Sequence, residues 1–158
     1  MTDTRDNFMK AAIDLSREKM AGGDGGPFGA IIVKDGKVVG RGWNRTVAEN
    51  DPTAHAEIVA IRDACRALGT YELTGCELYS SCEPCPMCMT AAMWARLDKV
   101  YFGAGRADAK DAGFDDEYFY DEIEKPPGER DLPAEQLLRD YAVRALEEWK
   151  LLPDKVIY

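Results

Sequence analysis

Three side chains in two short stretches of this sequence are of the types that bind zinc. His55 is the only histidine of the chain and stands two residues before Glu57, and Cys85 and Cys88 form a Cys-x-x-Cys pair. One histidine and two cysteines fill three positions of a tetrahedral zinc site and leave the fourth open, which is the layout of catalytic sites. Glu57 can take the proton of a water in that position. The sequence therefore predicts a zinc-activated water.

Length and composition predict one soluble domain covering residues 1–158. The apolar content of 46% and the charged content of 31% are ordinary for a globular protein. No apolar run approaches the ~18 residues that span a membrane, and the polar N-terminus is neither a signal nor a transit peptide. Five cysteines without an export signal indicate reduced thiols. We therefore expect a cytoplasmic protein without a membrane partner.

The charge of −9 argues against binding to a nucleic-acid polymer or an anionic membrane. Residues 105–131 hold ten acidic and four basic side chains, a net of −6 out of the −9. This segment is either a solvated acidic loop or a surface near the chemistry that repels phosphate backbones. The sequence leaves both interpretations open.

Periodicity predicts the element order α-β-β-α-β-α-β. The predicted elements are a helix from Phe8 that ends by residues 22–27, strands over 28–33 and 37–39, a helix from 51–52 to 68, a strand over 77–80, a helix from 84 to about 96 and a strand over 99–103. An Asp-Gly turn joins the first two strands as a hairpin. A helix between the last two strands implies that they are parallel. The result is a three-layer α/β domain with a mixed sheet.

Beyond Gly105 the pattern is weaker. Residues 118–123 form a short predicted helix, and an apolar stripe through Leu138 and Trp149 predicts another that Asp131 and Pro133 could begin. Residues 132–138 could instead form a fifth strand, although Pro133 counts against it. Propensity does not decide between strand and helix there.

The predicted elements place the zinc-binding side chains at two helix N-termini. Cys85 and Cys88 project from one side of a helix start, where the positive end of the helix dipole favours thiolates. His55 and Glu57 lie in the first turn of another helix. Each piece alone has a plainer explanation, such as a core histidine, a redox cysteine pair or half of a structural zinc site with Cys82 as the nearest further ligand. Two converging helix N-termini would instead form a pocket.

The order His-x-Glu and then Pro-Cys-x-x-Cys resembles the signature of zinc-dependent nucleobase deaminases, in which the glutamate is not a ligand. Residues 25–30, 50–57, 81–88 and 112–116 extend this likeness, and the chain resembles the bacterial guanine deaminases of the cytidine deaminase-like superfamily. The resemblance implies a cytidine deaminase-like fold with three α/β/α layers and a mixed five-stranded sheet. It also implies zinc as the only cofactor and a homodimer that exchanges segments from about residue 131 to 158.

The resemblance further implies hydrolytic deamination of a small purine base, guanine, to xanthine and ammonia. Zinc-bound hydroxide would attack C2 while Glu57 shuttles protons and Asp116 assists. The alternative without a catalytic role is that Asp116 is a solvated carboxylate in the acidic segment.

By the same resemblance, Phe28 stacks on the purine, Asn44 and the backbone of Ala56 bind its edge, and Tyr158 closes the pocket, from the partner subunit. Taken from the residues alone, Phe28 could be a core side chain, Asn44 a turn former and Tyr158 a residue docked on its own domain.

Other functions share the zinc motif. A deaminase of guanosine, cytosine or another amino-azine is the nearest alternative. A tRNA adenosine deaminase needs a basic surface, which the charge of −9 opposes. A zinc-stabilised interaction module without catalysis would have no special need for Glu57.

Overall fold

The structure is a computed structural model that describes residues 4–158 in two compact units, divided between Phe119 and Tyr120. The sheet and its covering helices belong to the first unit. Its elements are α1 (Thr4–Ala21), β1 (Gly29–Lys34), β2 (Lys37–Trp43), α2 (Thr46–Glu49), α3 (Ala56–Leu68), β3 (Cys76–Cys82), α4 (Pro86–Trp94), β4 (Lys99–Ala104) and α5 (Arg106–Asp111). Helix α6 (Asp116–Glu124) crosses the division, and a 3-10 turn (Pro127–Glu129) and α7 (Arg139–Leu151) follow it.

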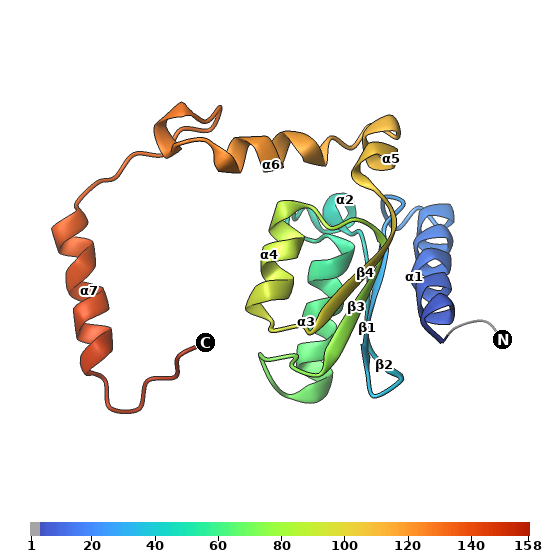
Figure 1. Ribbon diagram of the computed structural model, residues 1–158, viewed down its shortest axis with the longest axis horizontal. Helices are drawn as coiled ribbons and strands as arrows, with labels where there is room; N and C mark the ends of the chain where they lie inside the picture. Colours follow the sequence, from blue (N-terminus) through green and yellow to red (C-terminus); the bar gives the residue numbers. More distant parts are fainter. Residues whose placement is uncertain (1–3) are drawn as a thin grey trace. The chain divides into compact units, whose positions relative to one another are not determined.

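The sheet is mixed, with strand order β2-β1-β3-β4 (Figure 1). Strand β1 is antiparallel to β2 and β3, whereas β3 and β4 are parallel, as the helix between them predicted. Asp35 and Gly36 connect β1 to β2 with φ values of 48° and 71°. Positive φ at both residues is the requirement of a tight hairpin turn, so the Asp-Gly prediction is confirmed.

Helices cover both faces of the sheet, with α1 on one side and α3 and α4 on the other (Figure 1). Successive residues of β1 point to opposite faces. Ile31 and Val33 pack in a cluster with Ala12 of α1, and Ala30 and Ile32 pack in the cluster beneath α3. The predicted three-layer α/β/α architecture with a mixed sheet is therefore confirmed (Figure 1).

Helix α3 lies unusually close to β2 because β2 presents glycines to it. A Cβ on Gly42 would stand 2.1 Å from the carbonyl oxygen of Ala56, and one on Gly40 would stand 2.6 Å from that of Ala60. The facing residues of α3 are alanines that are fully buried. Small residues on both sides thus set how near the first turn of α3 comes to the sheet.

The start of α3 differs from the prediction. The helix begins at Ala56, with His55 as an extended N-cap (φ −71°, ψ 157°), and not at residues 51–52. Asp51 instead stabilises a local turn, because its Oδ1 accepts hydrogen bonds from the backbone N (2.8 Å) and Oγ1 (2.6 Å) of Thr53. Strand β2 is longer than the predicted 37–39, and the short helix α2, which was not predicted, follows it.

The predicted fifth strand is wrong: four strands make up the sheet in residues 4–158. Residues 132–138 adopt neither strand nor helix, and α7 starts at Arg139 instead of near Asp131. Leu138 precedes this helix in the left-handed conformation (φ 50°). Pro133 has no N–H for a strand ladder, and the next N–H, of Ala134, bonds to the carbonyl of Pro127 (2.9 Å).

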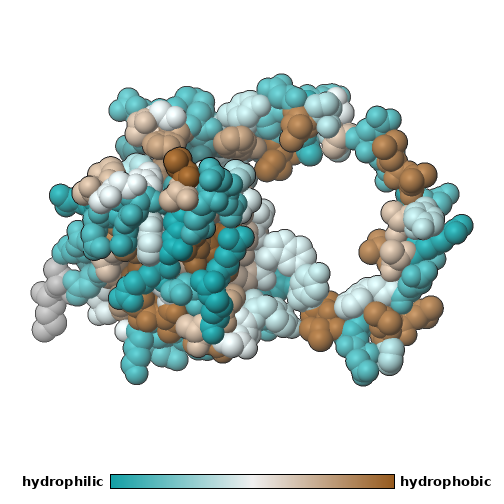
Figure 2. Space-filling model, turned by 180° about the vertical axis from the view of Figure 1, so that it is seen from behind, coloured by the Kyte–Doolittle hydropathy of each residue, from teal (hydrophilic) through white to brown (hydrophobic). Residues whose placement is uncertain are grey.

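The C-terminal unit, taken by itself, leaves many apolar side chains uncovered, and Figure 2 shows them in brown. Helix α7 buries none of its residues. Two expectations stay predictions: that residues 1–158 form one domain, and that its segment 131–158 is exchanged between subunits. No helix in the described part of the chain combines the length and hydropathy needed to cross a bilayer.

Replacing Gly42 with alanine tests the close approach of α3. The new Cβ would meet backbone atoms of Ala56 (2.1 Å) and Ala60 (2.4 Å), which cannot rotate away. We expect Gly42→Ala to lower the free energy of unfolding by about 2–3 kcal/mol, measured by urea unfolding.

Gly128→Ala is the matched control, since nothing lies within 4 Å of its added Cβ. It should change stability by less than about 0.5 kcal/mol. Equal stabilities of the two variants would contradict the close-packing account.

Candidate metal centre and pocket

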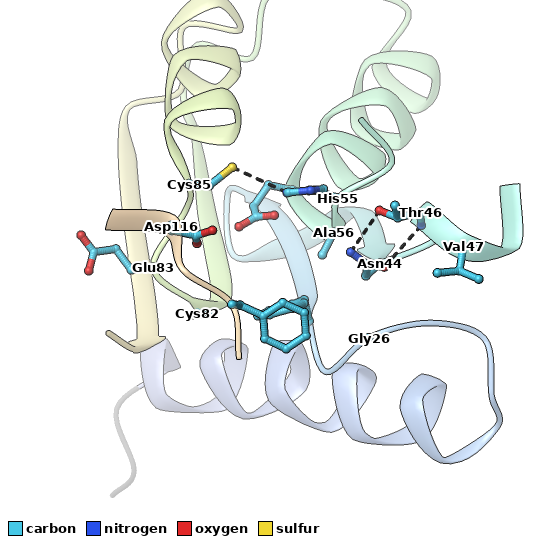
Figure 3. Close-up of a pocket in the computed structure, with 13 residues that line it drawn as sticks. Gly26, Asn44, Thr46, Val47, His55, Ala56, Cys82, Glu83, Cys85 and Asp116 are labelled. Atoms are coloured by element: carbon cyan, nitrogen blue, oxygen red, sulfur yellow. Dashed lines mark hydrogen bonds between the residues drawn. The ribbon is translucent and has the colours of Figure 1, made fainter. Parts of the chain in front are cut away.

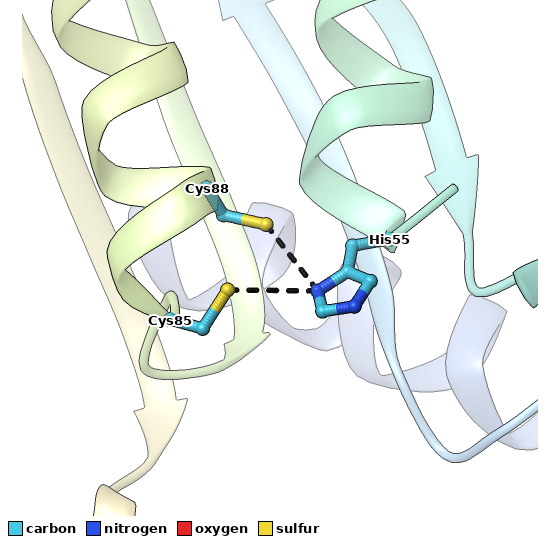
Figure 4. Close-up of side chains that lie close together, drawn as sticks. All are labelled: His55, Cys85 and Cys88. Carbon is cyan, nitrogen blue, oxygen red and sulfur yellow. Dashed lines mark hydrogen bonds between the residues drawn. The ribbon is translucent and has the colours of Figure 1, made fainter. Parts of the chain in front are cut away.

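His55, Cys85 and Cys88 converge between the N-termini of α3 and α4 (Figure 4). His55 is the N-cap of α3, Cys85 is the extended N-cap of α4, and Cys88 lies in the first turn of α4. The Nδ1 atom of His55 lies 3.6 Å from Sγ of Cys85 and 3.5 Å from Sγ of Cys88. All three potential ligand atoms lie within 4.8 Å of one another.

The donor set fits a zinc ion in both type and spacing. Zn–S bonds of about 2.3 Å and Zn–N bonds of about 2.0–2.1 Å at tetrahedral angles place nitrogen and sulfur ligand atoms about 3.6 Å apart. The two His55–cysteine distances of 3.5 and 3.6 Å agree with that spacing. A single imidazole nitrogen facing two sulfurs is therefore arranged to chelate and leaves one tetrahedral position open.

The protonation of the thiols follows from their closeness. Hydrogen bonds from the Cys88 thiol and from His55 lower the pKa of Cys85 to about 4, against the effect of burial. Cys88 holds the shared proton, so its pKa is raised. The hydrogen bond to Cys85 also raises the pKa of His55. A divalent cation at this point would replace these shared protons.

Glu57 lies beside the cluster and is almost completely buried, with 6% of its surface exposed. Ser80 of β3 donates a hydrogen bond from Oγ to its Oε1 (3.1 Å). Burial raises the pKa of Glu57, and the negative charge of the Cys85 thiolate raises it further. The carboxyl group thus holds a proton more readily than an exposed glutamate does, which suits a group that accepts a proton and returns it.

A cavity of about 420 Å³ opens beside the His55–Cys85–Cys88 group (Figure 3). A volume of this order is typical of sites for small molecules. It is lined by Gly26, Phe28, Asn44, Thr46, Val47, His55, Ala56, Glu57, Cys82, Glu83, Cys85, Phe114 and Asp116. The pocket therefore combines an aromatic wall with carboxylates and an amide beside the cluster.

Glu57 lines this cavity, and so do four further residues that we expected to contact the substrate or take part in catalysis: Phe28, Asn44, Ala56 and Asp116. Tyr158 belongs to the C-terminal unit, and its place at the pocket stays a prediction. Burial raises the pKa of Asp116, and the charge of Cys85 adds to the effect. Asp116 thus lines the cavity as a partly buried carboxyl group, and its part in catalysis stays a prediction.

The Asn44 amide is held by its neighbours. Its Nδ2 donates to Oγ1 of Thr46 (3.4 Å), and its Oδ1 accepts from the backbone N of Thr46 (3.3 Å). Its backbone N donates to the carbonyl of Phe28 (3.1 Å). A Cβ on Gly25 would come within 1.7 Å of the Asn44 carbonyl oxygen, so only glycine permits this packing. The glycine-rich segment thus packs against Asn44 and shapes the pocket.

Sequence reasoning missed several residues of the pocket: Gly26, Thr46, Val47, Cys82, Glu83 and Phe114. Phe114 meets Phe28 edge to face, with ring centroids 4.8 Å apart. Phe114 lay in one of the stretches that carry the family resemblance, so that signal could have found it. Thr46 and Val47 carried no such signal, because they lie in α2, which was not predicted.

Cys82 lines the pocket but is not a member of the His55–Cys85–Cys88 group. Burial raises the pKa of its thiol to about 11. The Sγ atom of Cys82 thus does not join the three potential ligand atoms that lie within 4.8 Å of one another.

Comparison with known proteins agrees with the donor set. Residues 2–104, which include all three candidate ligands, match the family described as the cytidine and deoxycytidylate deaminase zinc-binding region. The chain belongs to this family. The prediction of zinc as cofactor is confirmed by this match together with the His/Cys/Cys cluster.

Within the zinc-binding deaminases, the chain is 47% identical to guanine deaminase of Bacillus subtilis over 97% of its own length and 98% of that protein. The X-ray structure of the Bacillus subtilis enzyme superposes with a TM-score of 0.94. The expected resemblance to bacterial guanine deaminases is therefore confirmed.

Other relatives match less of the chain or at lower identity. The tRNA-specific adenosine deaminase of Aquifex aeolicus is 44% identical, but over 63% of this chain and 66% of that protein. A solved complex with 2,6-diaminopurine is 31% identical, covers 96% of this chain and 83% of the other, and has a TM-score of 0.66.

Removing a cysteine ligand should remove the metal. Because three protein ligands are the minimum that hold such a site, we expect Cys88→Ser to reduce bound zinc from about one ion per chain to less than about a tenth of that after dialysis. Metal analysis of the purified protein measures this.

Cys82→Ser is the matched control, because it changes a buried cysteine of the same pocket. It should keep about one zinc per chain. Loss of zinc from this control would make Cys82 a fourth ligand and the site a closed, structural one.

Proposed function

We propose that this chain is a zinc-dependent guanine deaminase that hydrolyses guanine to xanthine and ammonia. The observation that carries the proposal is the full-length likeness to the Bacillus subtilis guanine deaminase, at 47% identity and a TM-score of 0.94. The likeness to a tRNA-specific adenosine deaminase covers only 63% of the chain. The charge of −9 also disfavours an RNA substrate.

The shape of the pocket supports a purine base. Phe28 offers an aromatic surface for stacking, and Phe114 packs edge to face against it at 4.8 Å. Asn44 carries a donor and an acceptor, which suits the edge of a purine. The N–H of Ala56, at the first position of α3, has no partner within the helix and can bind an acceptor. A related structure that holds 2,6-diaminopurine, a purine with an amino group at C2, supports the same class of ligand.

In the proposed mechanism, zinc held by His55, Cys85 and Cys88 supplies a Lewis acid that lowers the pKa of a water to about 7. Glu57 takes the proton of the attacking water on its carboxylate and passes it to a ring nitrogen next to C2. Protonation of the ring makes C2 electrophilic. The Ser80 hydrogen bond (3.1 Å) holds Glu57 in one orientation for both transfers.

Departure of ammonia requires a second proton delivery. The exocyclic nitrogen on C2 must gain a proton before its bond to C2 breaks, and that proton comes from the hydroxyl that the attack leaves on C2, which becomes the C2 carbonyl of xanthine. We assign this to Glu57 with help from Asp116, whose pKa is raised by burial in the same cavity. Two carboxyl groups with raised pKa values near one pocket are the arrangement expected for proton transfer at neutral pH.

The C-terminal segment, residues 131–158 and here called the tail, has an apolar surface that bears on dimer formation. Apolar side chains of the C-terminal unit that are exposed include Leu137, Leu138, Tyr141, Leu146, Ile157 and Tyr158. Such a surface favours a protein partner over solvent. We infer a homodimer that exchanges residues 131–158, so that Tyr158 closes the pocket of the partner. Five free thiols, including two zinc ligands, suit a reducing cytoplasm.

A substrate panel tests the proposal directly. The zinc-loaded protein is incubated with guanine, guanosine, adenine, cytosine and cytidine, and ammonia is assayed. We expect release from guanine, with kcat in the usual range of about 1–1000 per second. No release from any compound would refute the deaminase, and release from guanosine alone would replace the substrate.

Glu57→Gln is the control for this panel. It keeps the shape of the side chain but cannot carry a proton, so turnover should fall by about a thousandfold while the zinc content and thermal stability stay unchanged. An active Glu57→Gln enzyme would contradict its role in proton transfer.

Mixed dimers test the exchanged tail. One subunit carries Glu57→Gln with an intact tail, and the other keeps Glu57 but lacks Tyr158. If each tail closes the partner's pocket, the mixed dimer contains one complete site and should regain about half of the normal turnover per dimer.

If each tail instead docks on its own domain, the mixed dimer has no complete site and should be as inactive as the Glu57→Gln homodimer. Full activity of the homodimer that lacks Tyr158 would exclude this residue from the site altogether.

A further inference from the structure

Glu83 lines the pocket, but its carboxylate points away from the pocket, toward Arg106. Figure 3 shows its carboxylate turned away from the pocket interior, whereas Asp116 points inward. The two carboxylate oxygens of Glu83 bind Arg106: Oε1 accepts from Nε (2.9 Å), and Oε2 accepts from the backbone N (3.2 Å). Charge-assisted bonds to two groups of one residue fix its position and its orientation.

Glu83 is itself firmly anchored. It follows directly after β3, and its backbone N donates to the carbonyl of Ala104 at the end of β4 (2.8 Å). Its side chain is 18% exposed, against 41% for Arg106. The carboxylate is therefore a fixed point between the ends of two parallel strands and can hold a more loosely attached segment.

Arg106 begins that segment. Residues 106–116, here called the wall segment, contain α5 and then turn back through Gly113 (φ 97°) to Phe114 and Asp116. Helix α5 has six residues and buries only Ala109. The helix therefore has little apolar packing of its own against the sheet.

Hydrogen bonds between backbone and side-chain groups run from Gly105, next to Arg106, to the far end of the wall segment. The backbone N of Gly105 donates to Oδ2 of Asp108 (2.8 Å), and the backbone N of Phe114 donates to the carbonyl of Ala109 (2.9 Å). The backbone N of Asp116 then donates to the carbonyl of Phe114 (3.3 Å). A rotation of α5 about its first residue would thus carry Phe114 and Asp116 with it.

We propose that Glu83 and Arg106 are positioning residues, and that their ion pair holds the wall segment so that Asp116 and Phe114 face the substrate. The inference rests on the proposed function in giving Asp116 a part in proton transfer. It adds a structural requirement: the placement of the aromatic wall and of the second carboxyl group depends on an ion pair whose arginine lies outside the cavity.

Arg106→Ala tests the pair, because Arg106 does not itself line the cavity. We expect kcat for guanine to fall by about tenfold, since small displacements of a catalytic group are costly. Arg106→Lys restores the charge without the planar fork and should recover part of this loss. Arg62→Ala is the matched control: Arg62 also pairs with a carboxylate, at 3.8 Å to Asp51, and its loss should change kcat by less than about twofold.

A second background separates positioning from a general structural role. In Asp116→Asn, which itself should lower kcat about a hundredfold, the proton-transferring group that the pair positions is already lost, and a displacement of Phe114 affects stacking on the substrate and so KM. Arg106→Ala should then lower kcat by less than about twofold more, since effects of residues that act as a unit are not additive. An equal tenfold loss in both backgrounds, or no loss in either, would overturn the proposal.

Hydrogen exchange gives a readout that does not depend on turnover. Arg106→Ala should raise amide exchange in residues 106–116 by about tenfold or more, and leave α3, α4 and the zinc content unchanged. Unchanged exchange there would overturn the proposal even if guanine is not the substrate. Raised exchange with an inactive wild-type protein would instead refute the proposed function and keep the ion pair as the support of the wall.

Discussion

The metal site depends on two helix N-termini that meet at one point. His55 and Cys85 occupy the N-cap positions of α3 and α4 in extended conformation, and neither makes a side-chain capping hydrogen bond. N-caps are usually serine, threonine, aspartate or asparagine, and losing such a cap costs a helix about 0.5–2 kcal/mol. Both helices lack this stabilisation, and the side chains of His55 and Cys85 point instead to a common centre (Figure 4). Zinc binding would offset the cost, so folding and metal affinity are coupled here.

The charges in the pocket also favour a bound cation. Two thiols, an imidazole and the carboxyl groups of Glu57 and Asp116 share a mostly buried region. Burial raises the pKa of both carboxyl groups, and the charge of Cys85 raises it further, so ionising all of these groups together is unfavourable without a cation. A divalent ion compensates both thiolates and so also sets how readily the two carboxyl groups exchange protons.

Much of this could be predicted from the sequence because its signals are local. The Asp-Gly turn, the helix after Pro86 and the His-x-Glu and Cys-x-x-Cys spacings involve neighbours along the chain. Asp51-Pro52 misled the prediction of α3 because the same residue types form a turn, here through Thr53.

Other features could not be predicted because they arise from tertiary contacts. Gly40 and Gly42 lay beyond the strand predicted over residues 37–39, and their importance appears only when α3 packs against them. Likewise, Glu83 precedes the cysteine ligands, but its partner Arg106 lies 23 residues further along the chain. The fifth strand was inferred from family resemblance, and residues 132–138 lack the ladder that would make one.

The central claim is an open zinc site with one histidine and two cysteine ligands. X-ray absorption at the zinc edge of the purified protein tests it most directly. The account predicts two sulfur ligands at about 2.3 Å and two nitrogen or oxygen ligands at about 2.0 Å, one of them exchangeable. Three or four sulfur ligands would bring Cys82 or another thiol into a closed site, and would contradict both the open position and the chemistry built on it.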